Sequence, residues 1–335
     1  MNQVEIINGI GKLIDGASKI VIIQADNPDG DSLASALALE QILGDLDKEV
    51  VLYCGVDVPR YLRYMSGWDR VTSELPTNFD ASIIVDTSSL MLLETLQKSD
   101  KISWVSSKPC IVIDHHVSPS TVYFASSYLI RQAVSTTELI YVLAEALGYD
   151  VNEDAANLLS IGILSDSLGL TSESVTVDAV KILADLIEKG ANLAQIDNQR
   201  KQLQKKSIEI LKYKGQLLDR VELSESGKTA FLIIPWDEIE KYSHQYNPAM
   251  LAIDEMRQVL GVDVAVVFKT YPDGRITGKI RANYGIRVAA MVAEQFGGGG
   301  HEYASGFRVT DGRKINDIKI AVVNAIEAQL NDEAV

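Results

Sequence analysis

The 335-residue chain contains little that would link it by disulfides or anchor it in a membrane. Its only cysteines are Cys54 and Cys110, and each stands beside an apolar run, so we expect buried free thiols rather than a disulfide. No apolar run approaches the roughly 20 residues that span a bilayer. The N-terminus has no basic stretch ahead of an apolar core. These absences predict a cytoplasmic protein without membrane contact.

Positive charge is also scarce. The chain has 31 Lys and Arg residues against 46 Asp and Glu residues, which gives a formal net charge of −15. A protein that holds long nucleic acid by releasing counterions needs a basic face. The densest basic stretch, residues 200–206, is typical of the solvated side of a helix. The composition therefore excludes long duplex nucleic acid as a partner, and any anionic substrate should be short.

Short apolar runs alternate with helical patterns through the first half of the chain. The runs KIVII, EVVLYC, ASIIVD and CIVID are each followed by a longer, more polar segment, and this alternation is typical of α/β folds with a parallel sheet. After about residue 215 the pattern changes to that of a smaller α+β domain. We therefore predict a first domain over 1–191, a helical linker over 192–214 and a C-terminal domain over 215–335.

Ionisable side chains gather where the predicted parallel strands end. The set comprises Asp29, Asp31, Asp86, Asp114, His115, His116 and, from a late position in an apolar helical segment, Asp166. In a parallel α/β sheet, ligands bind outside the carboxyl ends of the strands. An unpaired carboxylate at Asp166 would be costly in such apolar surroundings. Strands far apart in sequence should thus bring these groups to one edge of the sheet.

Helix capping is the alternative explanation for any one of these aspartates. Taken alone, Asp31 is more typical of a helix cap than of a metal ligand. Separate caps would explain neither two adjacent histidines nor a buried carboxylate at Asp166. Carboxylates with one or two imidazoles suit divalent cations such as Mn²⁺ and Mg²⁺. We predict two such ions, about 3.5–4 Å apart, which would polarise a phosphoryl group and activate water.

A run of four glycines at 297–300 precedes His301, and Arg281 stands upstream in a predicted strand. Glycines let the backbone approach a ligand closely and present N–H groups to an anion. A flexible connector is the alternative for the glycines, and a solvated strand charge is the alternative for Arg281. The convergence of these polar groups favours recognition of a phosphate or a base.

The motifs and their order resemble the DHH phosphoesterases, in particular the subfamily of nano-RNA (oligoribonuclease) and pAp phosphatases. The motifs are N-P-D-G-D-S at 27–32, V-D-T at 85–87, D-H-H at 114–116, G-I-L-S-D-S at 162–167 and G-G-G-G-H-x-x-A-S-G-F at 297–307. The resemblance covers essentially the whole chain. It implies a parallel-sheet DHH domain, a C-terminal substrate-binding domain and hydrolysis of a phosphoester by metal-activated hydroxide.

The resemblance also implies roles for individual residues. One metal would be held by Asp29 and Asp86, and the other by Asp31, Asp86, His115 and Asp166. The implied catalytic residues are Asp86, Asp114, His115 and His116. The implied substrate-binding residues are His116, Arg281, Gly298, Gly299, Gly300 and His301.

One position departs from the family pattern. The family has a histidine four residues before the first aspartate of its first motif, and this chain has Ala25 there, between Gln24 and Asp26. The departure removes one ligand from the first metal, which implies a weakened site or a one-metal enzyme. Asp26, or more weakly Gln24, could supply an oxygen ligand in its place.

The sequence thus predicts a metal-dependent phosphoesterase. Its expected substrates are short oligonucleotides, linear dinucleotides such as pApA, or the 3′-phosphate of pAp. Two alternatives stay open: an inorganic pyrophosphatase or polyphosphatase of the same superfamily, and a non-catalytic nucleotide-binding protein, because Ala25 replaces the family histidine. The sequence also leaves a homodimer open.

Overall fold

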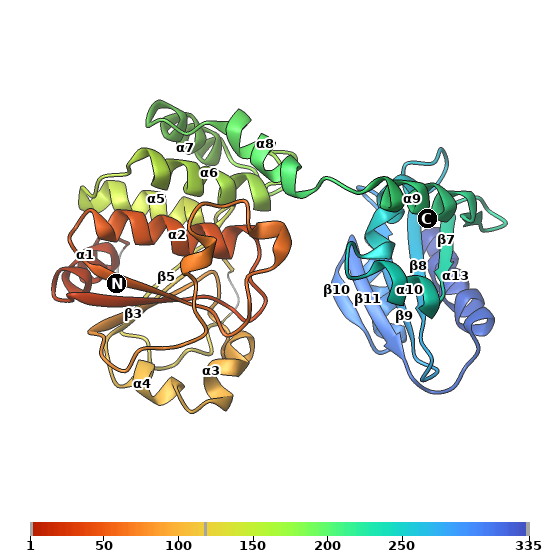
Figure 1. Cartoon of the computed structure of the whole chain (residues 1–335), viewed down its shortest axis with the longest axis horizontal. Coiled ribbons are helices and arrows are strands. Elements are labelled where there is room, and N and C mark those ends of the chain that lie inside the picture. Colours follow the sequence, from red (N-terminus) through yellow and green to blue (C-terminus); the bar gives the residue numbers. More distant parts are fainter. Residues whose placement is uncertain (1–2, 117–118, 333–335) are drawn as a thin grey trace. The chain divides into compact units, whose positions relative to one another are not determined.

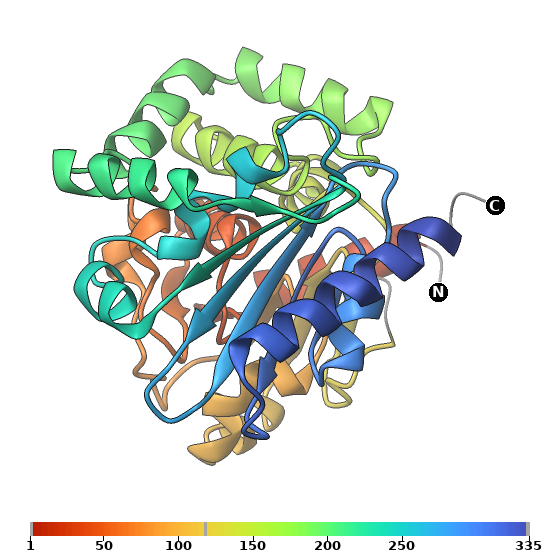
Figure 2. The same cartoon turned by 90° about the vertical axis from the view of Figure 1, so that its right-hand side faces the viewer.

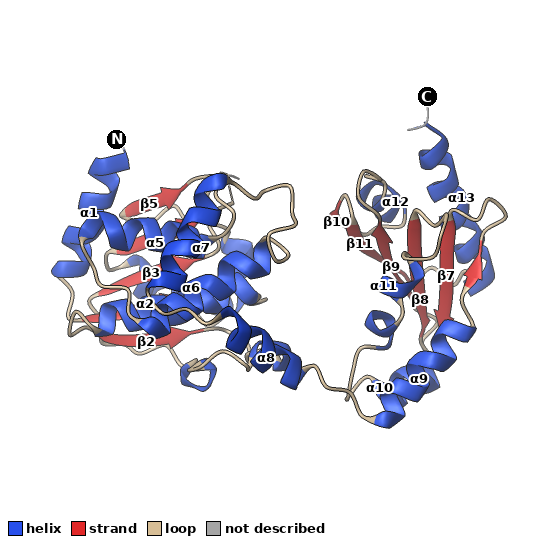
Figure 3. Cartoon of the chain, turned by 90° about the horizontal axis from the view of Figure 1, so that it is seen from above, coloured by secondary structure: helices blue, strands red, loops and turns tan. Residues whose placement is uncertain are grey.

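Two parts of the chain fold as separate units in the computed structural model, which describes residues 3–116 and 119–332 (Figure 1). The division falls between Lys205 and Lys206. The strands of each unit are flanked by helices (Figure 3). Among the described residues, no helix combines the length and the apolar character that crossing a bilayer requires.

The first unit is built on a five-stranded parallel sheet in the order β2-β1-β3-β4-β5. Its strands are β1 (Lys19–Ile23), β2 (Glu49–Tyr53), β3 (Ala81–Val85), β4 (Cys110–Asp114) and β5 (Ser127–Ile130). The chain crosses from β1 to β2 on one side and returns to β3 on the other, so the strand order reverses between β1 and β3. Such a reversal is the place where open α/β sheets bind ligands.

Helices cover both faces of this sheet. One face packs against α1 (Gln3–Asp15), α2 (Gly30–Gly44), α5 (Thr136–Leu147) and α6 (Glu153–Asp166), with α7 (Val177–Glu188) and α8 (Leu193–Leu203) outside them. The other face is covered by the shorter η3 (Leu90–Leu93), α3 (Glu94–Lys98) and α4 (Ile102–Ser106). Alternate residues of β1 explain how both faces are buried: Ile20 and Ile22 enter one core, and Val21 and Ile23 enter the other.

Two short 3₁₀ helices, η1 (Arg60–Leu62) and η2 (Trp68–Arg70), follow β2.

The predicted α/β class with a parallel sheet in the first unit is confirmed. Strand β5 was not among the predicted strands, because its sequence SYLI is short and stands in a segment that reads as a loop.

The second unit has a six-stranded mixed sheet in the order β10-β11-β9-β8-β7-β6. Its strands are β6 (Glu222–Leu223), β7 (Thr229–Ile234), β8 (Val264–Thr270), β9 (Ile276–Ala282), β10 (Gly299–His301) and β11 (Ala304–Val309). Helices α12 (Ala289–Gln295) and α13 (Ile315–Asp332) pack on one face, and Figure 2 shows α13, in dark blue, lying over the sheet. The other face packs against α9 (Ile208–Asp219), α10 (Trp236–Tyr242), η4 (Pro248–Leu251) and α11 (Ile253–Met256).

The segment predicted as a linker, 192–214, is divided between the two units. Ile196 of α8 belongs to the core of the first unit. Ile210 and Tyr213 of α9 belong to a core of the second unit. Both helices carry buried apolar side chains on one side, so each packs against its own unit and the change of unit occurs between them.

Candidate metal centre

Asp29 and Asp31 stand at the start of α2 and have different partners. Asp29 is the helix cap, since its Oδ1 accepts the backbone N–H groups of Asp31 (3.1 Å) and Ser32 (3.0 Å). Asp31 is completely buried. Its Oδ2 accepts the N–H of Thr136 (2.6 Å), and its Oδ1 accepts the N–H (3.1 Å) and the hydroxyl (3.0 Å) of Thr137. The Asp31 carboxylate therefore lies on the N-terminus of α5, where N–H donors and the helix dipole favour negative charge.

The start of α5 is shaped by a capping motif that the sequence analysis did not use. Ser135 accepts the N–H of Glu138 (3.2 Å), and the Glu138 carboxylate accepts the N–H of Val134 (2.9 Å). The sequence S-T-T-E ahead of an apolar run is the signal that could have revealed this helix start. The cap takes the N–H of Glu138, and the N–H groups of Thr136 and Thr137 remain available to Asp31.

Asp86 follows β3 directly and adopts a left-handed backbone conformation, with φ of 59°. Its N–H donates to the carbonyl of Ile113 (2.9 Å) in the neighbouring strand, which holds this turn in place. Its Oδ1 accepts the hydroxyl of Thr136 (2.9 Å). A non-glycine residue in this region costs on the order of 1 kcal/mol. The strand end is therefore bent so that the Asp86 carboxylate meets the start of α5.

Strand β4 ends at the D-H-H motif. Asp114 is completely buried, and its Oδ1 accepts the backbone N–H of His116 (3.1 Å) and lies 2.7 Å from His116 Nδ1. This hydrogen bond raises the pKa of the His116 imidazole. Asp114 thus orients His116, whose side chain is 57% exposed on its other side.

The partners of the two ring nitrogens of His115 show whether the site suits a metal. Its Nδ1 lies 3.2 Å from the carbonyl of Ala133 and donates to it, so in the neutral imidazole Nε2 is the nitrogen with a lone pair. That Nε2 is buried without a hydrogen-bond partner. It faces Asp86 Oδ1 at 3.6 Å and Asp166 Oδ2 at 3.4 Å. Three potential ligand atoms converge here, Nε2 makes no hydrogen bond, and a cation is the group that would satisfy all three.

Two sets of three ligand atoms, each within 4.8 Å of one another, share His115. One set adds Asp86 and His116, and the other adds Asp31 and Asp166. Burial raises the pKa of Asp31, of Asp86 and of Asp166, the last to about 8, and the neighbouring aspartates raise the pKa of Asp86 and Asp166 further. Carboxylate oxygens and an imidazole nitrogen held this close fit a divalent metal.

Two glycines allow α2 and α6 to approach closely at this site. A Cβ at Gly162 would lie 2.3 Å from Thr137 Oγ1 and 2.5 Å from Asp31 Oδ1. A Cβ at Gly30 would lie 2.1 Å from Ser165 Oγ. The Asp31 carboxylate therefore occupies space that any side chain at residue 162 would fill.

The loop after β1 contains the position that departs from the family pattern. Ala25 is buried, and Asp29 belongs to neither set of three ligand atoms, although its charge contributes to the raised pKa of Asp166. Asp26 points elsewhere, because its Oδ2 accepts the N–H of Thr95 (2.7 Å). Gln24 is completely buried and neither polar atom of its amide has a hydrogen-bond partner. Asp26 therefore holds the backbone at Thr95, and it is not among the grouped ligand atoms.

We expect Asp26→Ala to leave bound metal unchanged and to lower the free energy of unfolding by about 1 kcal/mol, since it removes one hydrogen bond to a backbone N–H. Metal analysis of the purified protein and urea unfolding measure the two effects. Asp31→Ala is the comparison that should lose metal. Loss of metal in Asp26→Ala would instead make Asp26 a ligand.

One further cation at the same sheet edge was missed by the sequence analysis. Arg131 follows β5, and its N–H lies 3.4 Å from the carbonyl of Asp114. Its side-chain Nε is buried without a hydrogen-bond partner. No sequence motif singles it out, because a lone Arg after a short strand is common.

The predicted substrate residues of the second unit lie on β9 and on the hairpin β10-β11. Arg281 and Lys279 face the same side of β9, and Lys269 of β8 lies on that side two register positions further along. Burial lowers the pKa of all three cations, that of Lys269 to about 8, and neighbouring positive charges lower it further, while Asp254 opposes this for Arg281. Lys269 and Lys279 line a cavity of about 410 Å³ together with Gly298. The two lysines were not identified from the sequence.

The glycine run forms a tight hairpin in place of a flexible connector. Gly299 to His301 is strand β10, which pairs with β11. A Cβ at Gly298 would lie 2.1 Å from the carbonyl oxygen of Gly306, and Gly300 has φ of 140°. Close backbone packing therefore requires these glycines whether or not a ligand binds. As the edge strand of the sheet, β10 has one side without a neighbouring strand.

Comparison with known proteins agrees with this geometry. Residues 19–163 match the N-terminal domain of the DHH family, and residues 236–328 match the DHHA1 domain. The chain is 26% identical over 291 residues to the bifunctional oligoribonuclease and PAP phosphatase NrnA of Bacillus subtilis (strain 168), covering 86% of this chain and 88% of that protein.

The protein of the same name from Thermus thermophilus is 25% identical over 297 residues, covering 88% of this chain and 85% of that protein. The crystal structure of an exopolyphosphatase-related protein from Bacteroides fragilis has the same fold, with a TM-score of 0.83 at 22% identity over 98% of both chains. The two matching domains together span well over half of this chain. The chain therefore belongs to the DHH family and carries the DHHA1 domain.

Proposed function

We propose that this phosphoester hydrolase acts on short oligoribonucleotides, on linear dinucleotides such as pApA and on the 3′-phosphate of pAp. The observation that carries the proposal is the unpartnered Nε2 of His115 facing the carboxylates of Asp86 and Asp166. The relatives named as oligoribonucleases and PAP phosphatases support the substrate class. The net charge of −15 agrees with a short substrate rather than a long one.

The metal we propose is Mn²⁺, because an imidazole ligand beside carboxylates favours it over Mg²⁺. Bound divalent ions would polarise the phosphoryl group and lower the pKa of water. The chain's own groups position the ligands: Thr136 orients both Asp31 and Asp86, and the carbonyl of Ala133 fixes the tautomer of His115. His116, oriented by Asp114, would donate a hydrogen bond to a phosphate oxygen.

The cations of the second unit are proposed to bind a phosphate of the substrate. Among the described residues, Lys269, Lys279 and Arg281 have no carboxylate within ion-pair distance. Partly buried positive charges on one side of the sheet, with none of them in an ion pair to a described residue, favour an anionic ligand. Gly297 and Gly298 line the same cavity as Lys269 and Lys279, which supports the same ligand class.

Lys279→Ala and Arg281→Ala are each expected to raise KM for pAp and for pApA by about tenfold, while bound metal stays unchanged. A charge-assisted hydrogen bond contributes about 1.5–3 kcal/mol, and its loss should affect binding. Lys314→Ala, an exposed cation of the same unit, is the control and should leave KM unchanged. Unaltered KM in the first two variants would remove these residues from the substrate site.

A hydrolysis panel with added Mn²⁺ tests the proposed function. The panel contains pAp, pApA, a five-residue oligoribonucleotide and inorganic pyrophosphate, and bound metal is measured on the same sample. We expect hydrolysis of the three nucleotides, with pyrophosphate the poorest substrate. Preferred hydrolysis of pyrophosphate would assign the protein to a different substrate class, and no metal-dependent turnover on any of the four would contradict the proposal.

A further inference from the structure

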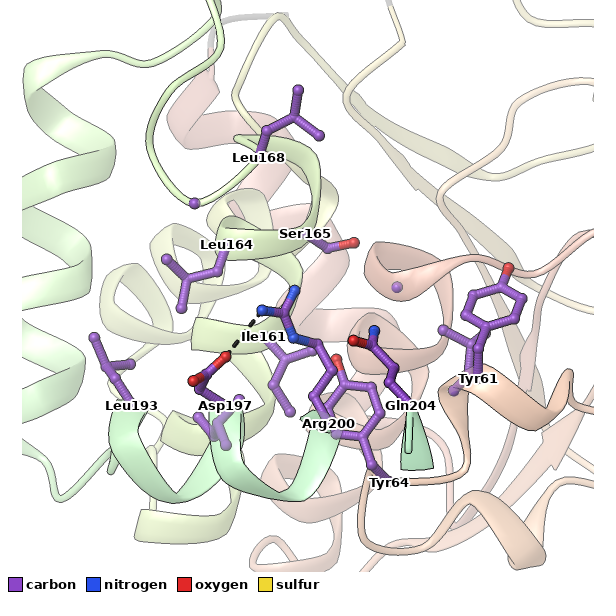
Figure 4. Close-up of a pocket in the computed structure, with 14 residues that line it drawn as sticks. Tyr61, Tyr64, Ile161, Leu164, Ser165, Leu168, Leu193, Asp197, Arg200 and Gln204 are labelled. Atoms are coloured by element: carbon purple, nitrogen blue, oxygen red, sulfur yellow. Dashed lines mark hydrogen bonds and ion pairs between the residues drawn. The ribbon is translucent and has the colours of Figure 1, made fainter. Parts of the chain in front are cut away.

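A cavity of about 620 Å³ lies within the first unit, apart from the residues assigned to metal and substrate (Figure 4). Its walls come from the segment of η1, from the end of α6 and its following turn, and from α8. Its volume falls within the range of small-molecule sites. Because all of the lining residues belong to one unit, the structure fixes their arrangement.

The cavity adjoins the candidate metal centre. Gly30 lines it and stands between Asp29 and Asp31, and Ser165 lines it and precedes Asp166. Burial and the negative charge of Asp29 raise the pKa of the phenol of Tyr61, which also lines the cavity. A ligand in the cavity would therefore lie beside a phosphate held at the metal ligands.

The lining offers flat apolar surface together with hydrogen-bonding groups. Tyr61 and Tyr64 supply aromatic rings, and Leu164 supplies an aliphatic surface. Arg200 donates to Asp197 (2.9 Å) within the cavity, which Figure 4 shows as a dashed line. Gln204 adds an amide. A planar ring with donors and acceptors on its edge, such as a nucleobase, fits this combination because bases stack on aromatic and guanidinium planes.

The turn after α6 is strained where it meets the cavity. Leu168, Gly169 and Leu170 all have positive φ, of 52°, 72° and 68°. Leucine rarely adopts this conformation, which costs on the order of 1 kcal/mol for each residue. The side chain of Leu168 lines the cavity and is 73% exposed. Backbone strain of this kind clusters at functional sites.

We propose that this cavity binds the second nucleoside of a linear dinucleotide or longer substrate. pAp and pApA share one nucleotide and the phosphoryl group on its 3′ oxygen, and pApA adds a nucleoside esterified to that phosphoryl group. Because Gly30 and Ser165 line the cavity next to the metal ligands, a nucleoside esterified to a phosphoryl group held there would reach it. This assignment rests on the proposed function, and it makes the cavity responsible for the difference in binding between pApA and pAp.

The test compares KM for pApA and for pAp in the full chain with Mn²⁺. Arg200→Ala and Tyr64→Leu are expected to raise KM for pApA about tenfold, as base stacking on a protein side chain typically does, and to leave KM for pAp within about twofold. Lys201→Ala is the matched control: Lys201 also pairs with Asp197 but lies outside the cavity lining, so both KM values should stay unchanged.

Equal effects of Arg200→Ala and Tyr64→Leu on both substrates, or no effect on either, would overturn the cavity assignment while leaving the proposed function intact. If the wild-type chain hydrolysed neither pAp nor pApA, the proposed function itself would be wrong and this assignment would be overturned with it. Unfolding curves of the variants separate a loss of binding from a loss of fold.

Discussion

Replacing Asp86 by Ala is expected to reduce turnover about a thousandfold and to lower bound metal. The Asp86 carboxylate faces the Nε2 of His115 at 3.6 Å, and the resemblance to the DHH phosphoesterases implies that it holds both ions. Loss of metal polarisation at a phosphoryl group removes several kcal/mol of transition-state stabilisation, and each 1.36 kcal/mol is tenfold in rate. Turnover of pAp and metal content of the purified variant measure the effect.

The left-handed backbone at Asp86 calls for two controls. Asp86→Asn keeps a residue type that tolerates this conformation and removes only the charge, so it should lose metal as the Ala variant does. Asp47 has nearly the same φ, 58°, outside the site, so Asp47→Ala should cost stability alone. Near-wild-type turnover in Asp86→Asn would show that this carboxylate holds no catalytic metal.

Gly162→Ala is expected to weaken metal binding about 10- to 100-fold, although it alters no ligand. The added methyl group would lie 2.5 Å from Asp31 Oδ1 and 2.3 Å from Thr137 Oγ1, so the Asp31 carboxylate or α6 must move. Displacing an oriented ligand typically costs this much affinity. Overpacking of this kind also destabilises a core by about 1–3 kcal/mol. Titration of the metal-free protein with Mn²⁺ measures the change in affinity.

Gly9→Ala is the matched control for Gly162→Ala. Gly9 also lies inside a helix, α1, but a Cβ there has no heavy atom within 4 Å. Alanine should therefore stabilise that helix by about 0.5–1 kcal/mol and leave metal affinity unchanged. If Gly162→Ala behaved like Gly9→Ala in both measurements, the close contact with Asp31 would have no functional meaning.

The sequence was most informative where burial and periodicity act together. The strands KIVII, ASIIVD and CIVID are almost wholly apolar because both of their faces are covered, and this made the parallel sheet predictable. Once the strands were placed, Asp86 and Asp114 had to stand at the same edge. The strand order also brings the start of α2, with Asp31, next to Asp86.

The features that could not be predicted depend on contacts between distant segments. Strand β10 contains glycines without intrinsic strand preference and forms only because β11 pairs with it. The donors of Thr136 to Asp31 and Asp86 join residues 105 and 50 positions apart. The role of Asp26 likewise depends on where Thr95 lies, which no local pattern reveals.

The most direct test of the metal centre is pulsed EPR of the full chain loaded with Mn²⁺, which detects nitrogen nuclei bound to the ion. We predict coupling to an imidazole nitrogen in the wild type and its loss in His115→Ala, together with loss of pAp hydrolysis. Wild-type Mn²⁺ without nitrogen coupling, or unchanged coupling and turnover in His115→Ala, would contradict the assignment of the buried Nε2 of His115 as a metal ligand.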